Sequence, residues 1–124
     1  MFSIKNTTRK KTPRVPFKKI KEAVLGKNYE LSLALIGDKL SRKLNKKYRK
    51  IDKPAAVLSF SFSKQEGEIF INLNLAQKQC FKFDRNFEKF TGFLLIHGLM
   101  HLKGCEHSSK MERAEERIRR RFEI

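Results

Sequence analysis

All three histidines of the chain lie between residues 93 and 107, in a segment that reads FLLIHGLMHLKGCEH. His97 and His101 are four residues apart, so a helix would place them on one face, about one turn from each other. Gly104 favours the end of that helix, because glycine adopts the left-handed conformation of a helix C-cap without a steric penalty. The chain would then turn and return His107 toward the other two. The segment therefore predicts three converging imidazoles.

Three converging imidazoles are typical of a zinc site. Neutral nitrogen ligands without carboxylates disfavour magnesium and calcium, although nickel, cobalt or iron could occupy such a site in a preparation. Three protein ligands leave one position on zinc for water, as in catalytic rather than structural sites, and that water becomes a nucleophile at neutral pH. A single histidine on an apolar face is more often a core residue. Here, however, all three histidines of the chain occur together at metal-ligand spacing, which predicts one bound Zn²⁺ per chain.

The spacing H-x-x-x-H-x-x-G-x-x-H is also that of the metzincin proteases, which carry a glutamate general base directly after the first histidine. This chain has Gly98 there, so a peptidase would lack its central catalytic group. Glu106 is a candidate for proton transfer at the site. Cys105 is a better fit to a small side chain filling the turn than to a fourth metal ligand.

The residues from Arg85 or Asn86 to Lys103 are apolar around most of a helical circumference, which is typical of a buried central helix. The residues that form this surface are Phe87, Phe90, Phe93, Leu94, Leu95, Ile96, Leu99, Met100 and Leu102. His97 and His101 continue this apolar surface and reach its edge. The sequence thus predicts a metal cleft formed at the end of a buried central helix.

The remaining pattern mixes helices and strands and predicts one α+β domain. Strands are expected at residues 2–4, 29–36, 56–63 and 69–75, with a turn at 64–67. Three further helices are expected. The first spans residues 17–26, and the second spans 39–50, with Asp38 as N-cap and Leu40, Leu44 and Tyr48 on its apolar face. The third follows a capping box at 109–112, with Met111, Ala114, Ile118 and Phe122 on one side. Residues 76–83 are ambiguous. Residues 1–16 are basic and contain two prolines, which predicts an N-terminal arm before a domain at 17–124.

The net charge of +16 is concentrated in two places. Residues 1–27 carry nine basic groups against Glu22, a net +8, and residues 39–53 carry eight against Asp52, a net +7. Such a field favours a polyanionic partner, and the charge alone is compatible with RNA, DNA or an anionic membrane. A lysine-rich proteome would explain the count of lysines but not their clustering. The expected RNA-binding residues are Lys43, Lys46, Lys47 and Lys50.

The location is expected to be the cytoplasm. No apolar run is long enough to cross a bilayer, and the N-terminus lacks the apolar core of a signal peptide. Cys80 and Cys105 do not form a disulfide framework of the kind found in secreted domains.

Three stretches resemble the YbeY family of bacterial endoribonucleases. The family pattern H-G-x-L-H-L-x-G-Y-D-H appears here as HGLMHLKGCEH, with Met100, Cys105 and Glu106 as departures. Residues 44–62 resemble the pattern L-N-x-x-Y-R-x-x-D-x-P-T-D-V-L-S-F-P-F, and residues 67–76 resemble G-D-I-x-I-x-x-x-x-A. The resemblance covers about residues 17–124.

The resemblance implies a mixed four-stranded sheet packed by helices, with the metal in a cleft. It implies His97, His101 and His107 as zinc ligands, with His97 also a possible catalytic group. The family's functional arginine falls on Arg49, which could grip a phosphate and stabilise charge on phosphorus. The implied activity is a zinc-dependent, single-strand-specific endoribonuclease in 16S ribosomal RNA 3′-end maturation and ribosome quality control. Its partners would be ribosomal RNA and the small ribosomal subunit, with no DNA or membrane.

Two other functions stay open. Ala55 and Ala56 replace a polar pair of the family pattern, which favours a non-catalytic RNA- or ribosome-binding protein with a structural zinc. A zinc peptidase is the third reading, and Gly98 disfavours it.

Overall fold

The computed structural model describes residues 1–104 and 109–124, so Cys105, Glu106 and His107 lie outside the described residues. The elements follow in the order β1 (Phe2–Asn6), α1 (Phe17–Leu25), β2 (Glu30–Ile36), α2 (Asp38–Arg49), β3 (Val57–Ser63), β4 (Glu66–Asn72), α3 (Leu73–Gln79), the 3₁₀ helix η1 (Cys80–Phe83), α4 (Phe87–Leu102) and α5 (Ser109–Arg121). The α+β class predicted from the sequence is confirmed. No helix within the described residues is long and apolar enough to cross a membrane.

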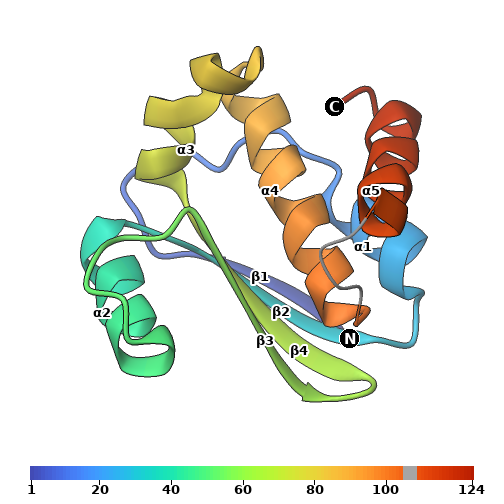
Figure 1. Cartoon of the computed structure of the whole chain (residues 1–124), viewed down its shortest axis with the longest axis horizontal. Helices are drawn as coiled ribbons and strands as arrows, with labels where there is room; N and C mark the ends of the chain where they lie inside the picture. Colours follow the sequence, from blue (N-terminus) through green and yellow to red (C-terminus); the bar gives the residue numbers. More distant parts are fainter. Residues whose placement is uncertain (105–108) are drawn as a thin grey trace.

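The four strands form one mixed sheet in the order β1-β2-β4-β3. β1, β2 and β4 run parallel, and β3 runs antiparallel to β4. Helices α1, α3, α4 and α5 lie on one face of this sheet, and α2 lies on the other (Figure 1). β1 falls within the stretch assigned to an N-terminal arm, and its Phe2 is paired with Leu31 of β2.

Helix α4 is the central helix that its apolar surface predicts. Asn86 caps it by accepting a hydrogen bond from the backbone N–H of Lys89 at 2.8 Å. Its buried residues are Phe90, Thr91, Gly92, Leu94, Leu95, Ile96, Gly98, Leu99 and Met100. They pack against β3, β4, α1 and α5, so the core lies between α4 and the sheet.

Two predicted strand boundaries were wrong. The strand expected to run to residue 75 ends at Asn72, whose side chain accepts hydrogen bonds from the N–H groups of Asn74 and Leu75 and so starts α3. The turn expected at residues 64–67 is shorter, because Glu66 and Gly67 already pair with β2 and β3. In the first case a helix cap determines the boundary, and in the second the pairing between strands determines it, rather than the apolar pattern.

Helix α2 also differs from its prediction. Its N-cap is Gly37 rather than Asp38, and the Asp38 carboxylate accepts hydrogen bonds from the side chains of Asn72 and Asn74. Asp38 therefore joins the start of α2 to the start of α3.

The buried positions of α2 are polar. Ser41 and Asn45 are buried, whereas Leu40 is 38% exposed and Tyr48 is 57% exposed. Ser41 hydrogen-bonds to both backbone groups of Ala55, and Asn45 donates to the carbonyl of Lys53 at 2.9 Å. These bonds tie α2 to the loop before β3, so the apolar face expected from Leu40, Leu44 and Tyr48 is not the buried one.

Helix α5 begins at Ser109 and packs as predicted. Met111 is buried, and Ala114, Ile118 and Phe122 pack against the core.

Gly98 allows α4 to lie close to the sheet. A Cβ at this position would be 2.9 Å from Oγ of Ser59, 3.2 Å from Cδ1 of Ile69 and 3.3 Å from Cγ2 of Val57. The Ser59 hydroxyl also donates a hydrogen bond to the carbonyl oxygen of Gly98 at 3.1 Å. Any side chain at this position requires Ser59, Ile69 and Val57 to shift, and a glutamate, as in the metzincins, would require the largest shift.

We expect Gly98→Ala to lower the free energy of unfolding by about 1–3 kcal/mol, because the added methyl overpacks the interface between α4 and the sheet. Chemical denaturation measures this change. Gly37→Ser is the control, since no atom lies within 4 Å of a Cβ at Gly37 and serine is a good N-cap. Equal stability of Gly98→Ala and the wild type would contradict the close approach.

Candidate active site

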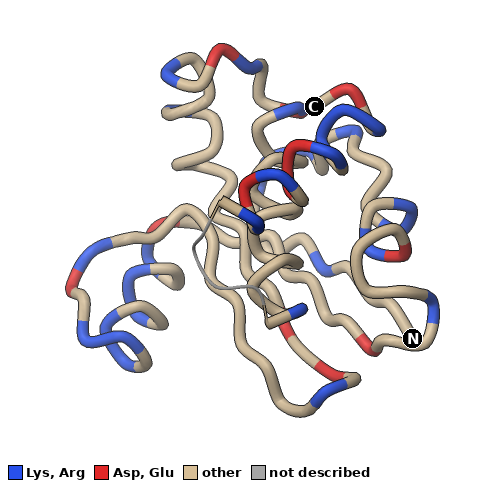
Figure 2. Tube along the Cα trace, turned by 45° about the vertical axis from the view of Figure 1, so that its right-hand side comes forward, with Lys and Arg blue, Asp and Glu red and all other residues tan. Residues whose placement is uncertain are grey.

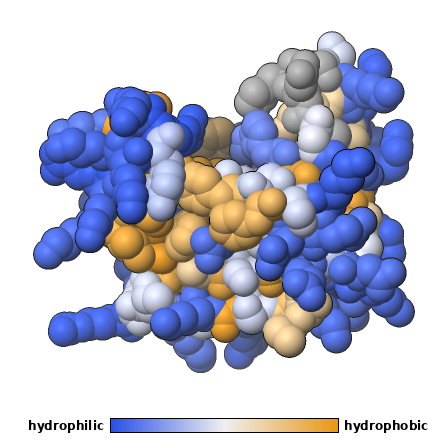
Figure 3. Space-filling model, turned by 90° about the horizontal axis from the view of Figure 1, so that it is seen from below, coloured by the Kyte–Doolittle hydropathy of each residue, from blue (hydrophilic) through white to orange (hydrophobic). Residues whose placement is uncertain are grey.

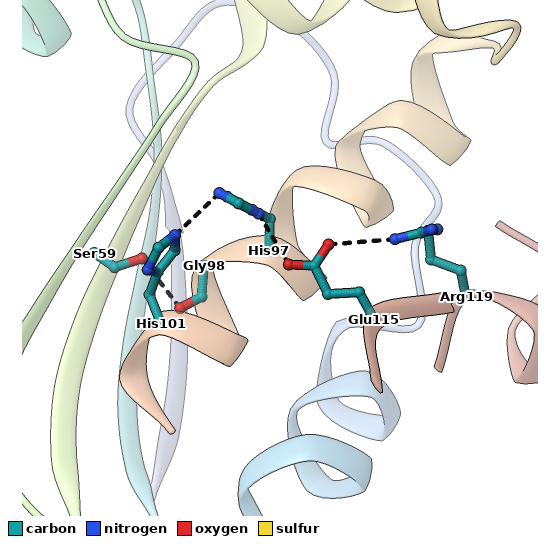
Figure 4. Close-up of polar contacts among 6 residues, drawn as sticks. All are labelled: Ser59, His97, Gly98, His101, Glu115 and Arg119. Carbon is teal, nitrogen blue, oxygen red and sulfur yellow. Dashed lines mark hydrogen bonds and ion pairs between the residues drawn. The ribbon is translucent and has the colours of Figure 1, made fainter. Parts of the chain in front are cut away.

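His97 and His101 project from the last two turns of α4 and converge (Figure 4). Their Nε2 atoms are 3.0 Å apart, and the two rings are close to perpendicular at 83°. Two nitrogens bound to one tetrahedral zinc at the usual bond length would be about 3.4 Å apart. The pair therefore fits a shared metal ion with only a small outward movement.

Glu115 of α5 sets the proton position on His97. Its Oε1 atom lies 3.0 Å from Nδ1 of His97. An ionised carboxylate only accepts hydrogen bonds, so Nδ1 carries the proton and donates it to Glu115. The other ring nitrogen, Nε2, faces His101. A carboxylate in this position is the usual partner of a metal-binding histidine.

Arg119 holds the other oxygen of Glu115. Its Nη1 atom donates to Oε2 at 3.2 Å, and the two residues are one turn apart on α5. The side chains of Glu115 and Arg119 are only 10% and 21% exposed. Arg119, Glu115, His97 and His101 thus form one chain of polar contacts that runs from α5 to the end of α4.

The electrostatics of this chain favour the ionised form of Glu115. Burial by itself would raise the pKa of the Glu115 carboxyl. The hydrogen bond from His97 and the positive charge of Arg119 act in the opposite direction and hold this pKa below its usual value. Glu115 is therefore an ionised acceptor at neutral pH.

Arg49 reaches the same site from the opposite face of the sheet. A pocket of about 330 Å³ is lined by Arg49, Val57, Leu58, Ser59, His97 and His101. Arg49 is the last residue of α2, and β3 is an edge strand, so the pocket crosses the free edge of the sheet. In the part of the chain that the structure describes, no carboxylate pairs with Arg49. Its guanidinium is thus available to an anion beside the histidines.

The other predicted site residues lie apart from this pocket. Lys43 and Lys46 line a separate surface hollow with Arg42 and Asp52. Lys47 lies over the ring of Tyr48, at 5.2 Å from its centroid. Lys50 is exposed at the C-terminus of α2. The predicted ligand His107 and the proton-transfer candidate Glu106 fall outside the described residues.

The sequence analysis missed Glu115, Arg119 and Ser59. Glu115 had a detectable signal, because it is four residues after Met111 and three before Ile118 on the apolar side of α5. A carboxylate on a buried stripe needs a cationic or hydrogen-bonding partner. The identity of that partner, His97, depends on how α5 packs on α4 and is not encoded in a local pattern.

We expect Glu115→Ala to lower the free energy of unfolding by about 1–3 kcal/mol at neutral pH, because it leaves His97 and Arg119 without their buried acceptor. The low pKa of Glu115 in the folded state means that its contribution is present above about pH 4, the value for an unfolded glutamate, and is lost as the pH falls further. Denaturation of both proteins across pH measures the difference.

The matched control is Glu116→Ala, since Glu116 pairs with Arg120 at 2.8 Å on the exposed side of α5 and should contribute less than about 0.5 kcal/mol. Long-range ¹H–¹⁵N spectra of the histidine rings add a direct readout. The wild-type His97 ring should be protonated at Nδ1, and Glu115→Ala should redistribute that proton. Equal costs for the two variants, with an unchanged His97 tautomer, would contradict the role of Glu115.

Known proteins resemble this chain in both sequence and fold. The family described as "Endoribonuclease YbeY" matches residues 3–123. Proteins with that name from Heliobacterium modesticaldum and Acholeplasma laidlawii are each 34% identical to the chain, over 113 and 103 residues. These matches cover 73% and 80% of this chain and 68% and 72% of the relatives. A third, from Petrotoga mobilis, is 37% identical over 100 residues, with 78% of this chain and 66% of the relative covered.

The fold has a counterpart among solved structures. The solution structure of the Thermotoga maritima protein TM1509 superposes with a TM-score of 0.66 at 22% sequence identity, covering 95% of this chain and 86% of that protein. This likeness supports the fold alone. The match over residues 3–123 and the identities of 34% and 37% confirm the resemblance read from the sequence, and with it the nuclease class of enzyme. The chain belongs to the YbeY family of endoribonucleases.

Proposed function

We propose that this protein is a zinc-dependent endoribonuclease that cuts single-stranded RNA in the cytoplasm, with the 3′ end of 16S ribosomal RNA as its substrate in ribosome maturation and quality control. The observation that carries the proposal is the pocket that brings Arg49 together with His97 and His101. The family membership supports RNA as the substrate, and the family resemblance supports ribosomal RNA and the small subunit as partners.

The donor set fits zinc. His97 and His101 would bind the ion through Nε2, with His107 as the third ligand predicted from the sequence. When bound, zinc would polarise a phosphoryl oxygen and make a water molecule acidic. Glu115 accepts a hydrogen bond from Nδ1 of His97, so His97 would bind the ion through its other nitrogen, Nε2.

Arg49 would orient the scissile phosphate. A guanidinium donates two parallel hydrogen bonds to phosphate oxygens, which fixes the position of the phosphorus atom. The same donors stabilise the extra negative charge that forms on these oxygens as the new bond to phosphorus develops and the bond to the leaving oxygen breaks. Arg49 thus acts on the side of the pocket opposite the histidines.

The basic surface of α2 would hold the flanking backbone of the RNA. This helix contains six basic residues and one acidic residue, Asp38. Figure 2 shows that this positive charge is concentrated on α2, whereas α5 carries both signs. The proposal therefore predicts that RNA binding depends strongly on salt concentration.

We expect His97→Ala and His101→Ala to abolish both zinc binding and RNA cleavage, because each removes one of the two converging nitrogens. Glu115→Gln should keep the ligands but lower the affinity for zinc by about 10–100-fold, as other partners of metal-binding histidines do. Competition with a chromophoric chelator measures the affinity, and circular dichroism controls for folding. RNA cleavage at the wild-type rate by a verified metal-free protein would sink the metal-dependent mechanism.

We expect Arg49→Ala to reduce kcat for RNA cleavage by about 10²–10³-fold without changing zinc content, because it removes a donor to the developing charge. Arg49→Lys should recover only part of this loss, since lysine lacks the two parallel donors. Arg120→Ala is the control outside the proposed RNA-binding surface, because Arg120 pairs with Glu116 at 2.8 Å on the exposed side of α5. Equal cleavage by the folded, zinc-loaded wild type and Arg49→Ala would favour the alternative of a non-catalytic RNA-binding protein.

A further inference from the structure

An aromatic row lies on the face of the sheet that carries α2. It consists of Tyr48 of α2, Phe60 and Phe62 of β3, and Phe70 of β4. We infer that this row is a stacking platform for the bases of single-stranded RNA that leaves the pocket of Arg49 and the histidines. The inference rests on the proposed function and extends it to how the substrate is held.

Two rings of the row are exposed, Phe60 and Phe70 are half-buried, and the rings of Tyr48, Phe60 and Phe70 adjoin each other. Tyr48 is 57% exposed and Phe62 is 63% exposed. The rings of Tyr48 and Phe60 have centroids 5.2 Å apart, and those of Phe60 and Phe70 are 5.9 Å apart. Viewed from below, the protein shows apolar surface gathered in a patch between hydrophilic regions (Figure 3).

The alternation of β3 places the row on the face away from the core. Val57 and Ser59 face α4 at Gly98, so Leu58 and Phe60 point to the opposite face. Phe62 lies where the β3–β4 register shifts; it is 63% exposed and lines a surface hollow with Ser32, Glu30 and Glu66.

Helix α2 leaves Tyr48 uncovered for a physical reason. The helix attaches to the rest of the protein through the polar side chains of Ser41 and Asn45, which bind the loop before β3. Tyr48 therefore stays at the surface, where Lys47 lies 5.2 Å from its ring centroid. An exposed aromatic ring beside a cation is the combination with which proteins bind single-stranded nucleic acids.

The charges around the row select a polyanion and orient it. On one side lie the basic residues of α2, Lys39, Arg42, Lys43, Lys46, Lys47 and Arg49. Glu68 of β4 is paired with Phe60 in the sheet, and Glu30 and Glu66 line the hollow of Phe62, so the negative charge lies at the end of the row away from α2. Phosphates would thus follow α2, and the bases would turn toward the rings.

The row is continuous with the proposed active site. Tyr48 directly precedes Arg49, and Leu58, which lines the pocket, is two residues before Phe60 on the same strand. A strand of RNA with its scissile phosphate at Arg49 would place the next bases over Tyr48, Phe60 and Phe62 in turn. Bases in a duplex are stacked on each other and cannot stack on these rings, so the platform would select single strands.

Fluorescence tests the platform directly, because the chain contains no tryptophan. Phe62→Trp places one indole on the row, and stacking on a base should quench its emission. Phe81→Trp is the matched control, since Phe81 is 70% exposed on η1, outside the row. Each variant is titrated, without added metal, with single-stranded RNA, with an abasic strand of equal length and charge, and with duplex RNA. Anisotropy of a labelled strand reports binding independently.

The expected result is saturable quenching of Phe62→Trp by single-stranded RNA only, with Phe81→Trp unaffected. Binding by anisotropy without this quenching would overturn the platform, as would equal quenching by the abasic strand. A change that depends on protein concentration without RNA would also overturn it and assign the row to a contact between two copies. If Phe62→Trp does not fold, Tyr48→Trp serves in its place.

Kinetics separate this inference from the proposed function. Phe62→Ala should raise KM for single-stranded RNA by about 10-fold, as for loss of one stacked base, with kcat nearly unchanged. Phe81→Ala should change neither constant. RNA cleavage with unchanged KM and kcat in Phe62→Ala would contradict the stacking platform but not the proposed nuclease function. Quenching of Phe62→Trp by single-stranded RNA without any RNA cleavage would support the stacking platform and contradict the proposed nuclease function.

Discussion

The close approach of α4 to β3 at Gly98 determines where the site can form. The Ser59 hydroxyl donates to the Gly98 carbonyl, and Gly98 contributes no side chain that would hold the helix away from the strand. Because His97 and His101 flank this contact on α4, the approach carries both imidazoles to the edge of the sheet. A bulkier residue at Gly98 would move the histidines away from β3 and from Arg49. Gly98 stands where the metzincin proteases have their catalytic glutamate, and here the packing of α4 on the sheet requires the glycine.

Two layers of polar contacts then hold the histidines in place. His101 and His97 meet through Nε2, and Glu115 fixes the outer nitrogen of His97 while Arg119 fixes Glu115. The ring of Phe93 on α4 lies under Arg119, 5.3 Å from its guanidinium carbon. The C-terminal helix is thus part of the site, although it contributes no residue to the pocket itself. Its packing through Met111 and Ile118 determines the position of the carboxylate relative to the histidine.

The sequence predicted the parts of this arrangement that local patterns encode. Helical spacing predicted the convergence of His97 and His101, and an apolar circumference predicted the buried position of α4. The uncovered face of α2 could not be predicted, because Ser41 and Asn45 are buried by hydrogen bonds to the distant residues Lys53 and Ala55. The role of Glu115 likewise depends on packing between two helices. Arg49 was identified only through the family resemblance, since nothing in a run of basic residues distinguishes one arginine from its neighbours.

The position of the pocket at a sheet edge has a topological cause. Arg49 belongs to the helix on one face of the sheet, and the histidines belong to a helix on the other face. An interior strand would separate them, so side chains from the two faces meet only beyond an edge strand. β3 is such a strand, and its pairing with β4 shifts register between Ser61 and Ser63. An irregular edge flanked by two helices is also poorly suited to pairing with another strand. The same edge can therefore stay open to a phosphate backbone without becoming a site of aggregation.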